Sequence, residues 1–313
     1  MTLYQIISLF VRCISNTSLS DWKRKFPEVD YQMLTDFFKQ NFNPQELIKQ
    51  SWSRLFSLME GWLILDEIVL EKSKKGKLKL VKRRYKSAGG YITPGISIVL
   101  LLWTNGSIRI PLRFHIWRPT EGSHTEAAMK LLSWFRNSVK VKPLCVLFDA
   151  GFCNQKFLKR LDDYGWCFVC RLPKTRLFNG IPIWRFKKQG YWNDIGYLNS
   201  GLKVKAVRIK DKFYITNKVS LSRERIIEWY GKRAEIEEVF KILKHICHWK
   251  GCRFRDDNKY ERFLSVGVVT FMCWEKARTE HQIPITIHKL RRNVMFDNYD
   301  LHIPDLDEVL DVA

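Results

Sequence analysis

GWLILDEIVL, residues 61–70, is a nearly continuous apolar run of strand length. Such a run is typical of a β-strand that is buried on both faces of a sheet. Asp66 lies in the middle of the run, where an unpaired carboxylate is strongly disfavoured unless a cation or a hydrogen-bond donor compensates its charge. Glu67 should point to the opposite face, because successive side chains of a strand alternate. The run therefore predicts a central strand that carries one carboxylate, Asp66, in need of a positive partner.

Downstream of this strand, the spacing of apolar residues alternates between the periods of strands and helices. The predicted elements are strands at 96–105 and 107–117, a helix at 123–138, a strand at 143–151, a helix at about 153–164 and a strand at 166–172. Asn105-Gly106 is a hairpin signal between the first two of these strands, and Ser123 with Glu126 forms a capping-box pattern. Three meandering strands followed by alternating helices and strands predict an α/β fold in which helices flank a mixed sheet.

The charge of the chain is strongly positive, with 54 Lys and Arg against 32 Asp and Glu and a net charge of +22. Such an excess is usually retained because a polyanion neutralises it, which makes nucleic acid the leading partner and an anionic membrane surface the alternative. The longest apolar runs, 96–103 and 266–274, are far below the roughly 20 residues that span a bilayer, so no membrane partner is expected. Eight scattered Cys residues make no disulfide framework, which indicates a reducing cytoplasm.

Composition and periodicity divide the chain into three predicted regions. These are a helical region at 1–59, which is a candidate DNA-binding element, an α/β region at 60–255 with a β-rich insertion at about 173–218, and a C-terminal region at 256–313. One long helix is expected from Leu221 to about His248, and another at roughly 258–280. Residues 293–313 contain six acids and no Lys or Arg, so this end is expected to stay away from DNA.

Two further acidic residues stand out in the α/β region. Asp149 ends the apolar run CVLF at a strand exit and is followed by Ala150-Gly151, which lets backbone pass closely. Glu237 lies in YGKRAEIEEVFKILK (230–244), where 100° per residue places four polar side chains on one stripe about 60° wide, beside an apolar stripe. The four residues of this polar stripe are Tyr230, Arg233, Glu237 and Lys244.

These carboxylates have an ordinary interpretation and a catalytic one. Asp at a strand end often caps a loop or pairs with a nearby Lys, and a solvated helix face with ion pairs would also carry a polar stripe. If Asp66, Asp149 and Glu237 converge on one point, however, they form the usual cradle for Mg²⁺ or Mn²⁺. Two such ions, about 3.5–4 Å apart, can activate an attacking oxygen and stabilise a leaving one in phosphodiester chemistry. We therefore expect these three residues to be catalytic and to hold two metal ions.

Basic and aromatic residues supply further candidate DNA contacts. The segment 72–86 has nine Lys or Arg residues and no acid, which suits a phosphate backbone. The residues of this segment expected to contact DNA are Lys82, Arg83 and Arg84. Trp184 and Trp192, in the basic insertion, are candidates for stacking on an extruded base, although packing in the core or on the surface is favoured for both.

Cysteine and histidine residues give two weaker patterns. Cys167 and Cys170 look like a redox or zinc half-motif, but they lie in a predicted strand, where residues three apart face opposite ways, so a core position is favoured. A second set could bind zinc, although its spacing fits no standard finger. Its members are His245, Cys247, His248 and Cys252.

The carboxylates and the polar stripe together resemble a known family. The chain resembles the DDE transposases of bacterial insertion sequences, specifically the insertion-sequence-four group. The Tyr-x2-Arg-x3-Glu-x6-Lys signature of that group is kept at Tyr230, Arg233, Glu237 and Lys244. LILDEI (63–68) and LFDAGF (147–152) are similar to the segments around the family's two Asp residues, and the resemblance covers about 60–255. One departure is Ala234, where many relatives have Trp, so a base-pocket role for that Trp is absent or moved.

The resemblance implies an RNase H-like fold, with Asp66 on the first strand, Asp149 after the fourth and a β-rich insertion before the helix that bears Glu237. It implies metal-dependent DNA cleavage at transposon ends and strand transfer into target DNA, with Tyr230, Arg233 and Lys244 contacting end phosphates. The implied partners are double-stranded DNA, at transposon ends and target, and a second copy of the chain in a homodimer on paired ends, at the nucleoid of a bacterial cell. The alternatives are a nuclease or resolvase of the same fold that acts by hydrolysis alone, and a DNA-binding protein that has lost its chemistry.

Overall fold

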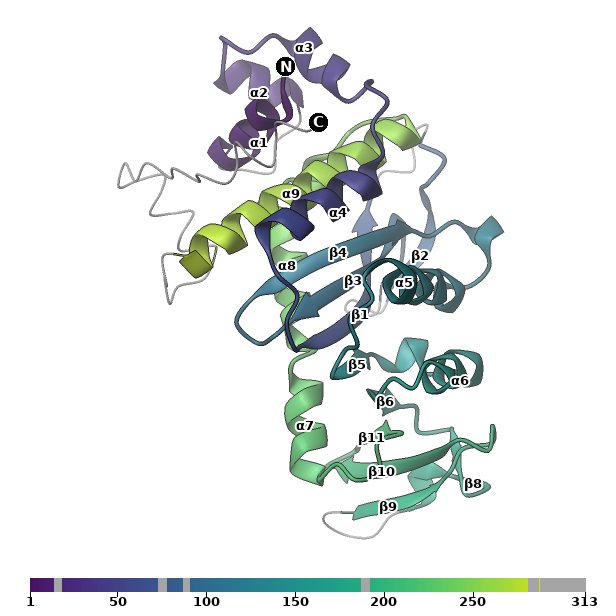
Figure 1. The fold of residues 1–313 in the computed structure, drawn as a ribbon. Coiled ribbons are helices and arrows are strands. Elements are labelled where there is room, and N and C mark those ends of the chain that lie inside the picture. The colour runs from purple at the N-terminus through teal and green to yellow at the C-terminus, as the bar shows by residue number, and fades with distance from the viewer. Residues whose placement is uncertain (14–18, 73–77, 87–90, 187–191, 281–286, 288–313) are drawn as a thin grey trace.

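One mixed sheet organises the protein (Figure 1). The computed structural model describes residues 1–13, 19–72, 78–86, 91–186, 192–280 and 287, and nine strands of these residues belong to the sheet. They are β1 (Trp62–Glu71), β2 (Lys82–Lys86), β3 (Tyr91–Thr104), β4 (Arg109–Ile116), β5 (Cys145–Phe148), β6 (Phe168–Leu172), β9 (Trp192–Tyr197), β10 (Lys203–Ile209) and β11 (Lys212–Thr216). Their order is β2-β3-β1-β5-β6-β11-β10-β9, and β4 also pairs with β3. Because β1 is antiparallel to β3 and parallel to β5, the predicted mixed sheet is confirmed.

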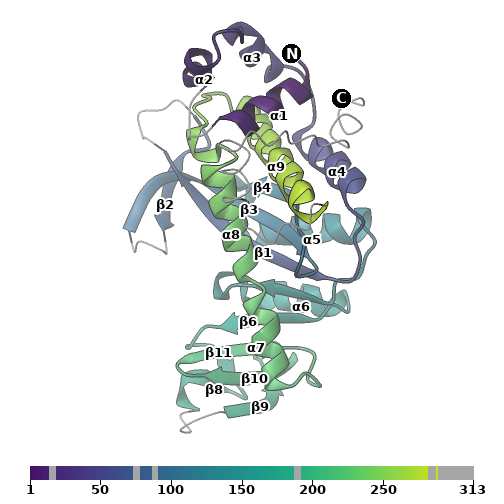
Figure 2. The same ribbon diagram turned by 90° about the vertical axis from the view of Figure 1, so that its left-hand side faces the viewer.

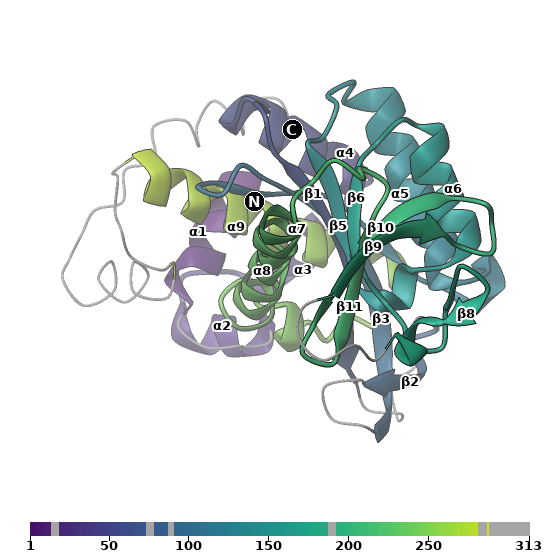
Figure 3. The same ribbon diagram turned by 90° about the horizontal axis from the view of Figure 1, so that it is seen from below.

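Helices cover both faces of this sheet, as the view in Figure 3 makes clear. The helices of this part of the chain are α5 (His124–Ser138), α6 (Gln155–Asp163), α7 (Arg223–Gly231), α8 (Ala234–His245) and α9 (Asp257–Glu280). α5 and α6 lie on one face, where Phe135 of α5 stacks on Trp103 of β3 at 5.8 Å. α7 and α8 lie on the other face, where Trp229 of α7 packs edge-on against Trp62 of β1. Asp66 is four residues beyond Trp62, so strand alternation turns its side chain to the α7 and α8 face.

The N-terminal residues form a helical layer at one end of the molecule (Figure 1). Its helices are α1 (Leu3–Arg12), α2 (Leu19–Lys25), α3 (Tyr31–Phe37) and α4 (Pro44–Leu55). Asn43 caps α4 by accepting hydrogen bonds from the backbone N–H groups of Gln45 and Glu46, and Pro44 fits the first helical position. α1 and α4 both pack on α9, and an aromatic cluster around Phe10, Trp22 and Phe263 joins these elements. The N-terminal helices therefore share one core with α9.

The segment expected as a β-rich insertion continues the main sheet at the opposite end of the molecule from α1–α3 (Figure 2). β11 pairs antiparallel with β6, and β10 and β9 follow as the outer strands. A small hairpin of β7 (Leu177–Phe178) and β8 (Ile181–Pro182) covers one face of this extension. Its core is a group of aromatic rings, Phe178, Phe186, Trp192 and Phe213. The strands β9, β10 and β11 therefore lengthen the main sheet and do not form a second sheet layer.

The long helix expected from Leu221 to about His248 is two helices, so that prediction is wrong at its centre. α7 ends at Gly231, the residue type with the lowest helix propensity after Pro, and α8 begins at Ala234. Between them the N–H groups of Lys232 and Arg233 donate to carbonyls three residues back, those of Trp229 and Tyr230. This is the tighter 3₁₀ pattern, so the backbone keeps helical dihedral angles while the turn is narrowed. Tyr230 thus belongs to α7 and Glu237 to α8.

The remaining features of the fold are an additional strand, four short 3₁₀ turns and the lack of a membrane-spanning helix among the described residues. β2 was not expected as a strand, and it forms because residues 82–86 pair with the first residues of β3. Short 3₁₀ turns are present at η1 (Pro119–Glu121), η2 (Ala150–Phe152), η3 (Ile183–Arg185) and η4 (Trp249–Gly251). No helix within the described ranges is both long and apolar enough to cross a bilayer. The acidic tail at 293–313 lies outside the described residues.

Candidate active site

Asp66 and Asp149 lie side by side because their strands run parallel and in register. β1 and β5 pair from Trp62 with Cys145 to Leu65 with Phe148, so the next residue along each strand is an aspartate. Both carboxylates are only partly exposed, and each accepts a hydrogen bond from the backbone N–H of the following residue, at 2.8 Å for Asp66 and 2.6 Å for Asp149. Local sequence patterns and sheet register thus agree on this pair.

Arg233 connects the aspartate pair to Glu237. Its Nη1 donates to Asp66 Oδ2 at 2.5 Å, and its Nη2 donates to Glu237 Oε1 at 2.5 Å. The side chains of Arg233 and Asp66 are 17% and 15% exposed, whereas that of Glu237 is 52% exposed. The narrowed turn after α7 places Arg233 at the start of α8, where its side chain reaches the sheet. Asp66 of β1 and Glu237 of α8, which are distant in sequence, therefore both accept hydrogen bonds from the Arg233 guanidinium.

The electrostatics of the site tie all three carboxylates together. Burial, with smaller contributions from the charges of Asp149 and Glu237, raises the pKa of Asp66 to about 6 against the opposing effect of Arg233. Burial opposes the charge of Arg233, but its four neighbours outweigh this effect and raise its pKa. Those neighbours, in order of effect, are Asp66, Tyr230, Asp149 and Glu237. The negative charge at Asp66 is therefore only partly compensated by the protein.

The donor types suit a hard divalent cation, but Arg233 now stands among them. Carboxylate oxygens are the ligands that Mg²⁺ and Mn²⁺ prefer, and a partly compensated buried carboxylate favours an added cation. Among the described residues, however, no group of three carboxylate, His or Cys side chains is gathered closely enough to hold an ion. Arg233 takes one oxygen of Asp66 and one of Glu237. A metal that used both residues would have to compete with this guanidinium.

Tyr230 and Lys244 occupy different parts of the α7 and α8 face. Tyr230 is the last but one residue of α7, its ring lies 5.8 Å from the Arg233 guanidinium, and burial raises its pKa. Lys244 is on the last turn of α8. Seven residues separate it from Glu237, about 10 Å along a helix axis. The structure therefore places Tyr230 beside Arg233, which joins Asp66 to Glu237, and it places Lys244 two turns further along α8.

The other candidate DNA contacts lie away from the carboxylates. Residues 82–84 belong to β2, which is separated from β1 by β3. Trp184 is 42% exposed on η3 and remains a candidate for contact with DNA. Trp192 is 8% exposed, and its ring is stacked on Phe186 at 5.1 Å and packed edge-on against Phe178. The stacking expectation for Trp192 is therefore corrected, because protein side chains already occupy the faces of this ring.

The cysteine and histidine patterns are explained by packing. Cys170 is fully buried, and Cys167 lies 3.3 Å from Cys145, sulfur to sulfur, across the β5 and β6 pair. His248 is buried and its Nε2 lies 3.0 Å from the backbone oxygen of Phe10. No metal-binding group is found in the parts of the chain that the structure describes. The zinc interpretations therefore have no support in this fold.

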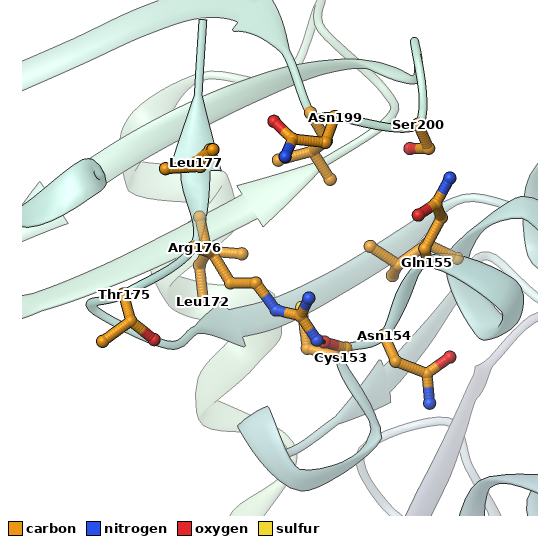
Figure 4. Close-up of a pocket in the computed structure, with 11 residues that line it drawn as sticks. Cys153, Asn154, Gln155, Leu172, Thr175, Arg176, Leu177, Asn199 and Ser200 are labelled. Carbon is orange, nitrogen blue, oxygen red and sulfur yellow. Dashed lines mark hydrogen bonds between the residues drawn. The ribbon is translucent and has the colours of Figure 1, made fainter. Parts of the chain in front are cut away.

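A small cavity of about 150 Å³ lies at the junction of α6 and the outer strands (Figure 4). Its polar lining includes Asn154, Gln155 and Arg176, and Arg176 donates to the backbone oxygen of Cys153 at 3.1 Å. Leu172 also lines it, and this residue alternates with Arg171, so the cavity opens on the α6 face. It is separate from the carboxylates on the opposite face.

Comparison with known proteins agrees with this geometry. Residues 63–271 match the protein-family model described as "Transposase DDE domain", a range that contains all three carboxylates. No curated protein matches the chain. One matching solved structure is the cryo-EM structure of a piggyBac transposase synaptic complex with hairpin DNA, with a TM-score of 0.50 and 12% sequence identity. The match covers 80% of this chain and 55% of that one, so this chain spans about half the length of that transposase, and the likeness shows the fold alone. The family match over most of the α/β region carries the assignment: this chain belongs to the transposase DDE domain family.

Proposed function

We propose that the protein is a metal-dependent transposase that cleaves DNA at transposon ends and joins the freed 3′ hydroxyl to target DNA. The observation that carries this proposal is the placement of Asp66 and Asp149 on adjacent parallel strands, together with the bonds that Arg233 donates to Asp66 and to Glu237 of α8. The net charge of +22 supports double-stranded DNA as the partner. Membership of the insertion-sequence-four group is part of the proposal, on the basis of the signature at residues 230–244.

Asp66, Asp149 and Glu237 are proposed to hold Mg²⁺ or Mn²⁺, as two ions. When bound, such ions activate the attacking oxygen and stabilise the leaving oxygen of an in-line displacement. The carboxylates must be ionised for this role, and the raised pKa of Asp66 makes its ionisation depend on a nearby cation. Arg233 supplies that cation in the protein alone, and its planar pair of N–H donors also matches a phosphate.

Arg233, Tyr230 and Lys244 are proposed to position the DNA end. Tyr230 lies beside Arg233 and within the field of Asp149, so a phosphate at the carboxylates would meet both side chains. Lys244 lies further along α8, where it would contact a more distant phosphate. The helices of residues 1–59 stay a proposed DNA-binding element, and a homodimer on paired ends, acting at the bacterial nucleoid, stays a proposed assembly.

The test uses the three carboxylates and a matched control. Asp66→Asn, Asp149→Asn and Glu237→Gln should each abolish Mg²⁺-dependent cleavage of DNA that carries the inverted repeats flanking the gene, while binding of that DNA survives. Glu238→Gln is the control, because Glu238 is the next residue of α8, is about half exposed and pairs only with Lys241 among the described residues. Nicking that persists in a purified carboxylate variant would remove that residue from the site.

The second candidate functions differ in their products. A nuclease or resolvase of this fold would cleave the same DNA and yield no joined product with a target plasmid. A DNA-binding protein without chemistry would give neither product with Mg²⁺ or with Mn²⁺. Strand-transfer products that depend on Asp66 therefore distinguish the transposase from both alternatives.

A further inference from the structure

A row of polar side chains crosses the sheet from the carboxylates to the outer strands. β5 and β6 pair in parallel up to Phe148 with Cys170, so Asp149 and Arg171 are the next residues of their strands. Arg171 in turn pairs with Tyr214 of β11. Directly opposed residues of neighbouring strands face the same way, so the row runs Asp66, Asp149, Arg171 and Tyr214 on the α7 and α8 face.

Arg171 is a partly buried cation with no anionic partner in the described part of the chain. No carboxylate of those residues lies within 4.0 Å of its guanidinium, and no hydrogen bond from it is formed there. Arg233, one element away, is by contrast committed to Asp66 and Glu237. The guanidinium nitrogens of Arg171 are not among the buried polar atoms that lack a partner, so a ligand can reach them, and an anion such as phosphate matches their geometry.

Tyr214 joins Arg171 to the signature residues. Its ring packs edge-on against Tyr230 at 4.7 Å between centroids. Burial raises the pKa of Tyr214, and the positive charges of Arg171 and Arg233 both oppose that rise, so its phenol lies within the field of both arginines. Within the described residues neither phenol donates to a protein acceptor, so both hydroxyls can serve an oxygen-rich ligand.

The charges of the outer strands extend this arrangement. By alternation from Tyr214, Lys203, Lys205 and Lys212 lie on the same face as Arg171, and Asp194 of β9 points to the other face. Lys205 donates to the backbone oxygen of Leu221 at 2.7 Å, so it also fixes the start of α7. The face that carries the carboxylates is therefore positive along β6, β10 and β11.

We infer that Arg171 and Tyr214 bind a DNA backbone phosphate next to the scissile one, on the side of the outer strands. Arg171 is one strand spacing, about 4.8 Å, from Asp149, and its charge acts on Tyr214 of the neighbouring strand β11. The contact is a charge-assisted hydrogen bond from the guanidinium, with the Tyr214 hydroxyl as a second donor to the same phosphate. This inference rests on the proposed function for the identity of the scissile phosphate, and the DNA contact itself does not depend on cleavage.

The first measurement is the salt dependence of DNA binding without divalent ions. A 40-base-pair duplex that ends in the inverted repeat flanking the gene is bound by wild type, Arg171→Gln and Arg136→Gln. Arg136 is the matched control, since it is an exposed arginine on α5, on the opposite face of the sheet. Loss of one phosphate contact should shallow the slope of log K against log salt by about 0.9 for duplex DNA and about 0.7 for a single strand. The slope should become shallower by this amount for Arg171→Gln and should stay at the wild-type value for Arg136→Gln.

The second measurement locates the phosphate. Single neutral methylphosphonate linkages are placed at each position around the cleavage site, and binding is measured with wild type and Arg171→Gln. At one position beside the scissile phosphate, the variant and the neutral linkage should together weaken binding no more than either does alone. Additive losses at every position, with a slope equal to that of Arg136→Gln, would overturn the inference.

Folding and function are kept apart by two further comparisons. If Arg171→Gln does not melt cooperatively, Arg171→Lys decides, because it keeps the charge and loses the two-pronged donor. It should retain most of the salt slope and should still lose affinity when the linkage at that one position is neutral, and a lysine variant that loses the full slope would contradict the inference. If Arg171→Gln and the neutral linkage are non-additive at one position but wild type does not cleave DNA with Mg²⁺, the proposed function fails while the Arg171 contact stands.

Discussion

Replacement of Asp66 by Asn should stabilise the metal-free protein at neutral pH while it abolishes cleavage. The pKa of Asp66 is raised from 3.8 to about 6, mainly by burial, so the folded state holds this proton at pH values where the unfolded chain has released it. Because its pKa is raised, the contribution of Asp66 to the free energy of unfolding is most favourable below pH 4 and is lost as the pH rises through 6. At about 1.4 kcal/mol per pH unit, the ionised carboxylate lowers the free energy of unfolding by about 3 kcal/mol above pH 6.

Asn removes this charge but also leaves Nη1 of Arg233 without its anionic partner. Arg233 keeps Glu237 at 2.5 Å and is 17% exposed, so the loss of one partner offsets part of the gain. A net stabilisation of about 1–3 kcal/mol at pH 8 is expected, shrinking toward zero at pH 4–5. Because a cation that binds only the folded wild type adds stability by mass action, Mg²⁺ should narrow the difference between wild type and variant.

The assay is urea unfolding of wild type and Asp66→Asn from pH 5 to pH 8, each with EDTA and with Mg²⁺. Glu238→Gln serves as the control for loss of an exposed carboxylate of α8 that lies outside the polar stripe, and should track wild type at every pH. An Asp66→Asn variant that is less stable than wild type at pH 8, with an unchanged pH slope, would refute the reasoning. It would mean that Arg233 fully compensates Asp66 in the folded protein.

Three other expectations follow from the same geometry. Arg233→Lys keeps the charge but cannot reach both Asp66 and a phosphate as a fork, so end cleavage should fall by at least tenfold while binding of arbitrary duplex DNA, measured by anisotropy, changes little. Neutralising residues 82–84 together should shallow the salt slope of duplex binding by up to about 2.7, and an unchanged slope would place β2 off the DNA. Trp192→Ala should lower the free energy of unfolding by about 3–5 kcal/mol, because it empties an aromatic core. Trp184→Ala should change stability by under about 1 kcal/mol and weaken end binding, and the same urea and anisotropy measurements check both variants.

The sequence carried the parts of the site that depend on local patterns. Asp66 and Asp149 could be predicted because each interrupts or ends a short buried strand, and parallel strands in register bring such positions together. The narrowed turn at Lys232–Arg233 could not, since helical periodicity is the same on both sides of Gly231 and only the hydrogen-bond pattern changes. The sequence shows no local sign of Arg171 or Tyr214, because the pairing of β6 with β11 joins residues more than forty positions apart. The sequence could not decide between packing and DNA stacking for Trp192 for a related reason, since a tryptophan in a basic segment looks the same whether it faces DNA or Phe186.

Arg233 also determines how metal and DNA affect each other at this site. In the protein alone it pairs with Asp66 and Glu237, so the first cation to reach these carboxylates must replace a guanidinium that already compensates them. Under the proposed function, a DNA phosphate would offer Arg233 another anion, and release of Arg233 from Glu237 would free carboxylate oxygen that could hold a metal. Metal binding and DNA binding should therefore be mutually favourable, and by linkage each should raise the affinity of the other by the same factor. A protein without Arg233 would lose this coupling while keeping all three carboxylates. The raised pKa of Asp66 shows that its buried charge lowers the stability of the protein alone. Under the proposed function, this loss of stability is tolerated because the site is complete only when substrate and metal are both bound.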